Sequence, residues 1–274
     1  MNKRAVIIGI VILVVLVVVL FTSKSEAAAR LSIDEGVVEA DTGSGWQPAV
    51  DGMSLSENDK VRTQEGIAIL FLYDSIIVQL EPFTEVVLSD LLETHPVVST
   101  TGGSVWVKFV SLIGIEGFSV ETPNTVAIVR GTEFGVSDDE VIVIEGVVDV
   151  YRGDDFVSVE AGHLVRFVAE KLELFALTEQ DIINTQDRQL RTLQYLKSLR
   201  DEQIRKSTII YEGLKMQYDL TDEEVSSYLE DFDSSDRNIT EAFAQIPYSS
   251  DSVETVEILS QEIRNKIISL RQVP

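Results

Sequence analysis

The motif Arg130-Gly131-Thr132 is the place in this sequence where residue types and spacing point most directly to binding chemistry. An arginine beside a glycine turn can present its planar guanidinium to a carboxylate through two parallel hydrogen bonds. Trp46 and Trp106 could add large apolar anchors to such a binding face. A structural role competes in each case, because Arg130 can pair with the chain's own acids, Thr132 can satisfy a turn, and tryptophans commonly fill cores. The excess of acids, 46 Asp and Glu against 22 Lys and Arg, favours the structural role for Arg130, and the two tryptophans are more often core residues. Partner binding is the alternative for all four residues, Arg130, Thr132, Trp46 and Trp106.

Motifs for enzymatic chemistry are missing from the sequence. It contains no cysteine and no G-x-S-x-G, H-E-x-x-H, G-x-G-x-x-G or phosphate-binding loop pattern. His95 and His163 have no partner at a metal-ligand spacing. The acidic runs 138–140 and 230–236 offer oxygen ligands for calcium, but they lack the glycine and glutamate of an EF-hand loop and are more typical of solvated turns. The sequence therefore predicts a non-enzymatic protein with no metal and no cofactor. An envelope hydrolase, which would need a cleft with converging carboxylates, is the alternative.

The N-terminal segment predicts attachment to a membrane. The run Ala5–Phe21 contains no charged residue and follows Lys3 and Arg4. As a helix it spans roughly 26 Å, enough for the hydrocarbon core of a bilayer. We therefore expect a transmembrane helix or uncleaved signal anchor over residues 5–22, with residues 1–4 as a short cytoplasmic tail.

A cleaved signal peptide is the competing interpretation of this segment. Ala27-Ala28-Ala29 supplies the A-x-A pattern of a peptidase site just before Arg30. The apolar run is longer than the usual hydrophobic region of a signal peptide, which favours the anchor. Both interpretations place the bulk of the chain outside the cytoplasm, in the periplasm or at the cell surface.

Residues 30–174 alternate short β-branched runs with Gly, Asp, Asn and Pro. Runs such as Ile67–Leu72 and Val141–Ile144 recur with turn residues between them, at the spacing typical of an all-β sandwich, roll or barrel. The short links Tyr73–Ser75 and Ser137–Glu140 indicate hairpin turns. No stretch with a helical period interrupts this segment, so the predicted fold is mainly β, an antiparallel sandwich or roll.

Residues 175–274 change to a helical period and form the predicted acidic helical region. Thr178 is placed as a helix N-cap, and apolar residues then recur every three to four positions as far as Gly213–Tyr218. Thr221–Glu224 has the pattern of a capping box for a shorter helix.

The last helix is expected to begin near Asp251 or Ser252 and to carry one apolar stripe between Val253 and Leu270. Its pattern extends over too few heptads for a coiled coil, which favours packing within the chain. Homo-oligomerisation through the C-terminal helices is the alternative.

Several motifs of the β segment occur in the order that is found in the FecR domain family. They are Trp46–Ala49, Gly52–Thr63, Gly103–Lys108, Phe118–Val126, Val129–Phe134, Glu145–Val150 and Glu160–His163. The segment 34–168 therefore resembles a FecR domain, and the pattern T-P-x6-R-G-T-x-F from Thr122 to Phe134 is its most specific part. The resemblance implies an all-β extracytoplasmic domain, best known in membrane-spanning regulators that relay a signal from an outer-membrane transporter to a sigma factor.

Those regulators hold the sigma factor with a cytoplasmic segment, and residues 1–4 are too few for that role. We therefore expect a membrane-anchored, non-enzymatic FecR-like protein that acts as a binding or scaffolding module of the cell envelope. The alternative is a transmembrane signalling regulator, related to the sigma-factor regulators, that acts through another membrane protein.

The net charge of −24 restricts the possible partners. A surface this acidic repels phosphate backbones, and no basic stripe in the sequence is long enough to offset that repulsion. The same repulsion excludes anionic lipid headgroups as partners for the bulk of the chain. An envelope protein or polymer, and not nucleic acid, is the expected partner.

Overall fold

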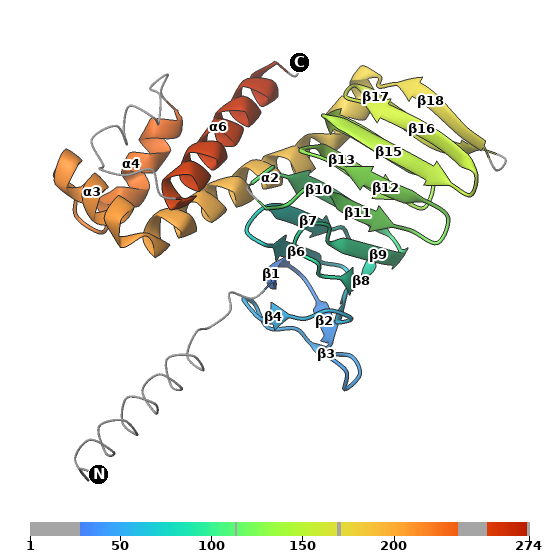
Figure 1. Ribbon diagram of the computed structural model, residues 1–274, viewed down its shortest axis with the longest axis horizontal. Helices are drawn as coiled ribbons and strands as arrows, with labels where there is room; N and C mark the ends of the chain where they lie inside the picture. The colour runs from blue at the N-terminus through green and yellow to red at the C-terminus, as the bar shows by residue number, and fades with distance from the viewer. Residues whose placement is uncertain (1–27, 113, 169–170, 235–250, 273–274) are drawn as a thin grey trace, which may run out of the picture.

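The structure, a computed structural model, describes residues 28–112, 114–168, 171–234 and 251–272. It contains two β-sheets that face each other and a group of helices that covers one of them (Figure 1). The predicted transmembrane segment lies outside the described residues. Within them, no helix combines the length and the apolar character needed to cross a bilayer.

Each sheet has nine strands. In spatial order, sheet A consists of β18 (Lys171–Ala176), β17 (His163–Val168), β14 (Glu140–Glu145), β13 (Glu133–Ser137), β10 (Ser104–Phe109), β7 (Ile76–Leu80), β6 (Ile67–Leu72), β1 (Ala29–Glu35) and β4 (Ser54–Leu55). Sheet B consists of β16 (Asp155–Glu160), β15 (Val147–Arg152), β12 (Val126–Val129), β11 (Phe118–Glu121), β9 (Val97–Gly102), β8 (Glu85–Asp90), β5 (Lys60–Thr63), β2 (Val38–Asp41) and β3 (Gln47–Pro48). Successive hairpins alternate between the sheets, so both sheets grow in the same direction along the chain.

Neighbouring strands pair antiparallel nearly throughout the described sheets, as the hairpin turns predict. β9 and β11 instead pair in parallel, because the chain between them crosses to sheet A, forms β10 and returns. The expected two-layer β-fold is confirmed, but the prediction of purely antiparallel sheets is wrong for sheet B, which is mixed. Since each hairpin pairs with hairpins that are close in sequence, the layout resembles a solenoid of stacked layers.

The main core lies between the two sheets. Phe109, Phe118 and Phe134 are among its largest fully buried side chains. Buried and exposed positions alternate along β8 and β12, as expected for a sheet with one solvated face. Every position of β6 and β7 is buried instead, because helices cover the other face of sheet A. This double burial explains why Ile67–Leu72 and Ile76–Leu80 are continuous apolar runs.

The helical region consists of α2 (Glu179–Lys206), α3 (Thr208–Tyr218), α4 (Glu224–Asp233) and α6 (Asp251–Arg271). Thr178 caps α2 as predicted, and the Asp181 carboxylate completes a capping box by accepting the Thr178 N–H at 2.8 Å. The expectation of one continuous helix as far as Gly213–Tyr218 is wrong. Ser207 adopts an extended backbone with ψ of 98° and separates α2 from α3.

α2 and α6 lie together across the outer face of sheet A (Figure 1). Leu196 and Leu199 of α2 and Leu259 and Ile263 of α6 pack against the outward-facing side chains of β6 and β7. α3 and α4 pack with the end of α2 and the start of α6 in a second cluster, centred on Ile204. The apolar stripe of α6 is therefore buried within the chain, as expected.

Gly146, between β14 and β15, provides a test of the close packing at the crossover between the sheets. Its φ is +77°, and a Cβ atom there would lie 2.6 Å from the Thr132 side chain and 2.8 Å from the Gly131 carbonyl. Gly153 also has a positive φ, of +58°, but has open space around it. We expect Gly146→Ala to lower the free energy of unfolding by about 3 kcal/mol and Gly153→Ala by about 1 kcal/mol, measured by urea unfolding. Equal losses in the two variants would contradict the packing shown here.

Candidate partner-binding site

The motif Arg130-Gly131-Thr132 forms a crossover between the sheets. β12 of sheet B ends at Val129, and β13 of sheet A begins at Glu133. Gly131 makes the turn with a φ of +58°, a conformation that favours glycine. The crossover leaves Arg130 exposed and buries Thr132 completely. One short motif therefore connects the exposed face of sheet B with the covered face of sheet A.

Beside Arg130, the outer face of sheet B carries a group of exposed apolar side chains, which we call the sheet B patch. It consists of Ile128, Val147, Tyr151 and Phe156, which are 37%, 44%, 39% and 52% exposed. Tyr151 and Phe156 lie opposite each other on β15 and β16, with ring centroids 4.9 Å apart. Asp149 lies on the same face of β15 between Val147 and Tyr151, is paired with Ile128, and accepts a hydrogen bond from Ser158 at 2.7 Å, so the patch contains one acidic residue among its apolar side chains. Exposed apolar side chains on one face are typical of interaction surfaces.

Arg130 forms no hydrogen bond and no ion pair with any residue that the structure describes. The favoured expectation, that it pairs with an acid of the chain, is therefore wrong for the described residues. Arg130 lies two residues after Ile128, which faces outward, and directly after Val129, which pairs with Val148 of β15. Its guanidinium is therefore exposed at the edge of the sheet B patch without a counter-charge among the described residues.

Behind the crossover, charged side chains are buried between sheet A and the helices; we call them the Glu133 cluster. Glu133 is fully buried and accepts hydrogen bonds from Trp106 Nε1 at 3.0 Å and from Lys266 Nζ of α6 at 2.5 Å. Lys266 also donates to Gln189 of α2 at 2.8 Å. These bonds join β10, β13, α2 and α6.

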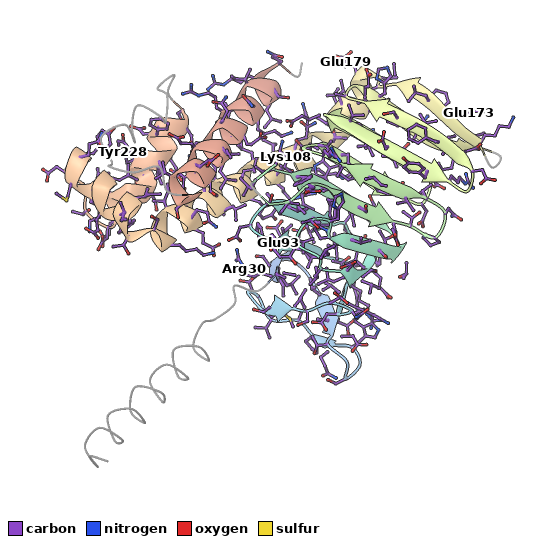
Figure 2. All side chains as sticks on the ribbon, viewed as in Figure 1. Arg30, Glu93, Lys108, Glu173, Glu179 and Tyr228 are labelled. Atoms are coloured by element: carbon purple, nitrogen blue, oxygen red, sulfur yellow. The ribbon has the colours of Figure 1, made fainter. Side chains whose placement is uncertain are left out.

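Lys108 is the second cation of the Glu133 cluster and lies where sheet A meets the helices (Figure 2). Its Nζ is 2.7 Å from Glu145 and 2.6 Å from Glu262 of α6. Burial opposes the charge of Lys108, but the carboxylates of Glu262, Glu145 and Glu133 outweigh burial and raise its pKa. Burial lowers the pKa of Lys266, and Glu133 offsets this only in part. The cluster thus holds the helices on sheet A through paired buried charges.

The structure does not bring the four predicted binding residues together. Trp106 is 1% exposed and lies against Gly135, where a side chain would collide with the indole, and Thr132 is buried as well. Trp46 is half-buried next to β3, with the Arg62 guanidinium 4.2 Å from its ring centroid. Five strands of sheet B separate β3 from β12, so Trp46 is not part of the sheet B patch.

Sequence reasoning missed the Glu133 cluster. Lys108 interrupts the apolar run Val105–Val110, and Glu133 stands between Thr132 and Phe134. A charge inside an apolar run of a buried strand requires a buried counter-charge, because an unpaired charge is costly away from water. That interruption is the signal that could have revealed the cluster.

Neither acidic run forms a metal site in the described part of the chain, where no group of three or more His, Asp or Glu residues has metal-binding geometry. Glu140 of the first run pairs with Arg166 at 3.0 Å. Asp233 of the second run pairs with Arg200 and with Lys197. These carboxylates therefore act as partners of cations within the fold.

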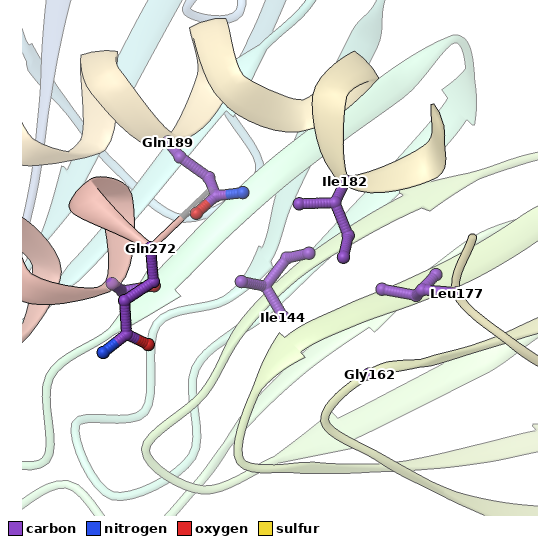
Figure 3. Close-up of a pocket in the computed structure, with 7 residues that line it drawn as sticks. Ile144, Gly162, Leu177, Ile182, Gln189 and Gln272 are labelled. Carbon is purple, nitrogen blue, oxygen red and sulfur yellow. The ribbon is translucent and has the colours of Figure 1, made fainter. Parts of the chain in front are cut away.

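A pocket of about 220 Å³ borders the Glu133 cluster between β14, the start of α2 and the end of α6 (Figure 3). It is lined by Ile144, Gly162, Leu177, Ile182, Gln189, Ser269 and Gln272. None of these described residues is charged, so the pocket offers a ligand mainly apolar contact and a few neutral hydrogen bonds.

Comparisons with known proteins bear on the β-domain. No curated protein matches the chain. Two crystal structures of a protein from Parabacteroides distasonis, provisionally described as an anti-sigma factor, are 16% identical to it, with TM-scores of 0.41 and 0.40. The similarity covers 46% and 45% of this chain and 63% and 62% of those chains, less than two thirds of their length. The model of the FecR protein family matches residues 59–149, from just before β5 into β15. The resemblance to a FecR domain is confirmed over this segment, which lies within the range 34–168 expected from the motifs and is shorter than it.

Proposed function

We propose that this chain is a membrane-anchored, non-enzymatic FecR-like protein that binds an envelope partner outside the cytoplasm as a binding or scaffolding module. The FecR segment and the apolar run Ala5–Phe21 support this proposal. The observation that carries it is Arg130, which has no ion-pair or hydrogen-bond partner in the part of the chain that the structure describes and lies beside the exposed sheet B patch. An apolar centre with an arginine at its side is typical of specific protein interfaces. The partner that fits presents a carboxylate next to apolar side chains.

The start of the fold bears on how the chain is attached to the membrane. Ala29 is fully buried in β1, where it pairs with Leu72. The Ala28 carbonyl accepts a hydrogen bond from the Tyr73 N–H at 3.0 Å. Cleavage just before Arg30 would remove both alanines from the folded sheet, which supports the uncleaved anchor over the cleaved signal peptide.

Photo-crosslinking in intact cells tests the proposal. A chain with a photoreactive phenylalanine analogue at Phe156 is expected to form a defined adduct in carbonate-washed membranes. Arg130→Glu is expected to reduce that adduct about tenfold, because it replaces an attractive charge with a repulsive one. The matched control is Lys60→Glu, an exposed charge reversal on β5 at the far side of sheet B.

Failure of the analogue at Phe156 to form a defined adduct would overturn the proposed site, as would equal losses in Arg130→Glu and Lys60→Glu. Recovery of the protein in the soluble fraction alone would overturn the membrane anchor.

A transmembrane signalling regulator that acts through another membrane protein is the second candidate, and the FecR match favours it. The same crosslinking experiment separates the two, because the partner is identified from the adduct. A membrane-spanning partner supports the regulator, and a peripheral envelope protein supports the scaffolding module.

A further inference from the structure

The turn between β7 and β8 holds a phenylalanine in a strained and exposed position. Phe83 has a φ of +59°, in the left-handed region that a bulky side chain rarely adopts, and is 69% exposed. Strain of this kind persists only where the surrounding structure imposes it, and it is concentrated at binding and active sites. The turn therefore directs an aromatic ring into solvent at an energetic cost.

The backbone on both sides of Phe83 is held by neighbouring turns. The Phe83 N–H donates to the Gln64 carbonyl at 2.8 Å. The Thr84 hydroxyl donates to the Ser104 carbonyl and accepts from the Ser104 N–H, both at 3.0 Å. A Cβ atom at Gly103 would lie 2.6 Å from the Thr84 Cα, so the glycine allows the two turns to pack directly against each other. These contacts fix the position of the ring before any ligand binds.

Phe83 lines an open groove of about 380 Å³ at the ends of β5, β8 and β9, which we call the Phe83 groove. Its volume is in the range of sites that bind small molecules. Arg62, Glu85 and Thr101 also line it. The register between β8 and β9 shifts next to Glu85, and Thr101 is the extra, exposed residue at this bulge. Bulges of this kind commonly redirect a side chain toward a binding site.

Arg62 is the middle residue of a charged row on the outer face of sheet B. The strand register places it directly opposite Glu39 of β2 and Glu85 of β8. Its Nε donates to Glu39 at 2.8 Å, and its guanidinium lies 4.2 Å from the centroid of the Trp46 ring. Gln64 donates to the same Glu39 oxygen at 3.1 Å. These contacts orient Arg62 in advance, which lowers the entropic cost of binding a ligand.

The Phe83 groove offers hydrogen-bonding groups that have no partner in the described part of the chain. Neither terminal nitrogen of Arg62 donates a hydrogen bond there, and the Glu85 carboxylate and the Thr101 hydroxyl form no hydrogen bond or ion pair. The guanidinium donates, the carboxylate accepts and the hydroxyl does both. A ligand that fits therefore carries both donors and acceptors beside a face that packs on an aromatic ring.

We propose that the Phe83 groove binds a neutral glycan, with a sugar ring stacked on Phe83 and its hydroxyls bonded to Arg62, Glu85 and Thr101. A pyranose ring has a face of C–H groups, which pack on the negative face of an aromatic ring. Its rim carries hydroxyls, which donate and accept as these three residues require. The net charge of −24 repels acidic polymers, so the glycan that fits is uncharged.

The composition of the groove favours a sugar over a protein partner. Phe83 is the only apolar side chain among the described residues that line it. The centre of a protein interface is built from several apolar side chains, as in the sheet B patch. That patch lies on β12, β15 and β16, and β11 separates these strands from β9, β8 and β5. The glycan site is therefore independent of Arg130 and leaves the sheet B patch uncovered.

The fluorescence of the full-length chain tests this proposal. The chain has two tryptophans, and Trp106 is 1% exposed, so a change of emission on adding a ligand reports on Trp46, which packs against Arg62. The probes are chitotetraose, cellotetraose, maltotetraose and the neutral polysaccharide extracted from the cells that make the protein, added in a detergent without a sugar headgroup. A saturable change is expected with at least one of them.

The response is expected to depend on the ring of Phe83. Phe83→Gly is expected to bind the glycan about tenfold more weakly, yet to unfold at the same urea concentration as the wild type or a higher one, because glycine adopts a positive φ without strain. Phe83→Tyr keeps the aromatic face and is expected to bind like the wild type. Asn58→Gly is the matched control, since Asn58 is exposed, has a φ of +68° and lies outside the groove.

The absence of a saturable change with all four probes would overturn the proposal, and would leave the groove to a protein partner or to no ligand. Wild-type affinity in Phe83→Gly, or an equal loss in Asn58→Gly, would overturn the stacking of a sugar on Phe83. Because none of these substitutions touches Arg130 or the sheet B patch, the crosslinking test of the proposed function is independent of this result.

Discussion

Glu133→Gln is expected to lower the free energy of unfolding by about 3 kcal/mol at pH 7, the typical cost of leaving a buried charge without its partner. Glu133 is fully buried and is bonded to Lys266, which is 5% exposed. Glutamine keeps the shape of the side chain and can still accept the hydrogen bond of the Trp106 N–H. The loss of stability therefore reports the removed charge and not a change of shape. Urea unfolding followed by far-UV circular dichroism measures the effect, with Glu65→Gln at an exposed position as the matched control.

The deficit of Glu133→Gln is expected to shrink as the pH rises. Burial already lowers the pKa of Lys266 below 10.5, and the removal of Glu133 takes away a group that raises it. Between the lowered folded-state pKa and 10.5, the unfolded chain binds more protons than the folded chain, so stability increases with pH in this window. A second variant, Glu133→Gln/Lys266→Met, removes both charges and is expected to recover most of the loss at pH 7.

Two results would contradict this account of the Glu133 cluster. One is a Glu133→Gln variant within about 0.5 kcal/mol of the wild type, the range of ordinary surface substitutions. The other is a double variant that is less stable than Glu133→Gln alone. Either would mean that the buried pair does not hold α6 on sheet A.

Arg200→Met is expected to lower the free energy of unfolding by about 3 kcal/mol at pH 7 and to release α4 from α2. Arg200 is 1% exposed, and its guanidinium binds both carboxylate oxygens of Asp233 and one oxygen of Asp201, the latter at 3.0 Å. Methionine fills much of the volume but leaves Asp233 with only the Lys197 ammonium, at 3.3 Å, among the described cations. Hydrogen exchange is expected to show faster exchange of the amides in α4.

The deficit of Arg200→Met is expected to shrink toward acid pH. Burial raises the pKa of Asp201 above 3.8, although Arg200 lowers it in part. In Arg200→Met the folded-state pKa of Asp201 rises further. Above that pKa the buried Asp201 carboxylate is charged, and the variant shows its full loss of stability. As the pH falls toward 3.8, the folded chain takes up the proton first and recovers stability relative to the unfolded chain.

Arg205→Met is the matched control for Arg200, because it lies on the same helix and its hydrogen bond, to Ser226 at 2.8 Å, is exposed. It is expected to cost no more than about 0.5 kcal/mol. Equal effects of the two substitutions, or a loss in Arg200→Met that does not change with pH, would contradict the role given to the Arg200–Asp233 pair.

Much of the fold could be predicted from local sequence patterns. Thr178 was identified as the cap of a long helix, and the links at Tyr73–Ser75 and Ser137–Glu140 as hairpin turns, because caps and turns depend on a few neighbouring residues. The parallel pairing of β9 with β11 was not predicted, since the two strands are adjacent only after the chain has left sheet B and returned. The break at Ser207 was also missed, because no glycine or proline marks it.

The candidate site was predicted only in part. Arg130 stays a predicted binding residue, but the partner favoured for it was an acid of the chain, and the structure leaves it exposed and unpaired among the described residues. Trp106 was proposed as either an anchor or a core residue, and the structure places it in the interior with its N–H on Glu133. The apolar residues of the sheet B patch resemble core residues in sequence, so their exposure could not be read from it.

By itself, the sequence determined the β-domain, the FecR motifs, the helical region and the absence of known catalytic patterns, because each depends on residue types at short spacing. Only the tertiary structure decided which face of each strand is covered. The helices bury Lys108 and Glu133 on sheet A, whereas nothing among the described residues covers Ile128 and Phe156 on sheet B. The neighbouring residues in the sequence do not distinguish a strand side chain on a covered face from one on an uncovered face. Its exposure, and therefore its role, depends on elements that are distant along the chain.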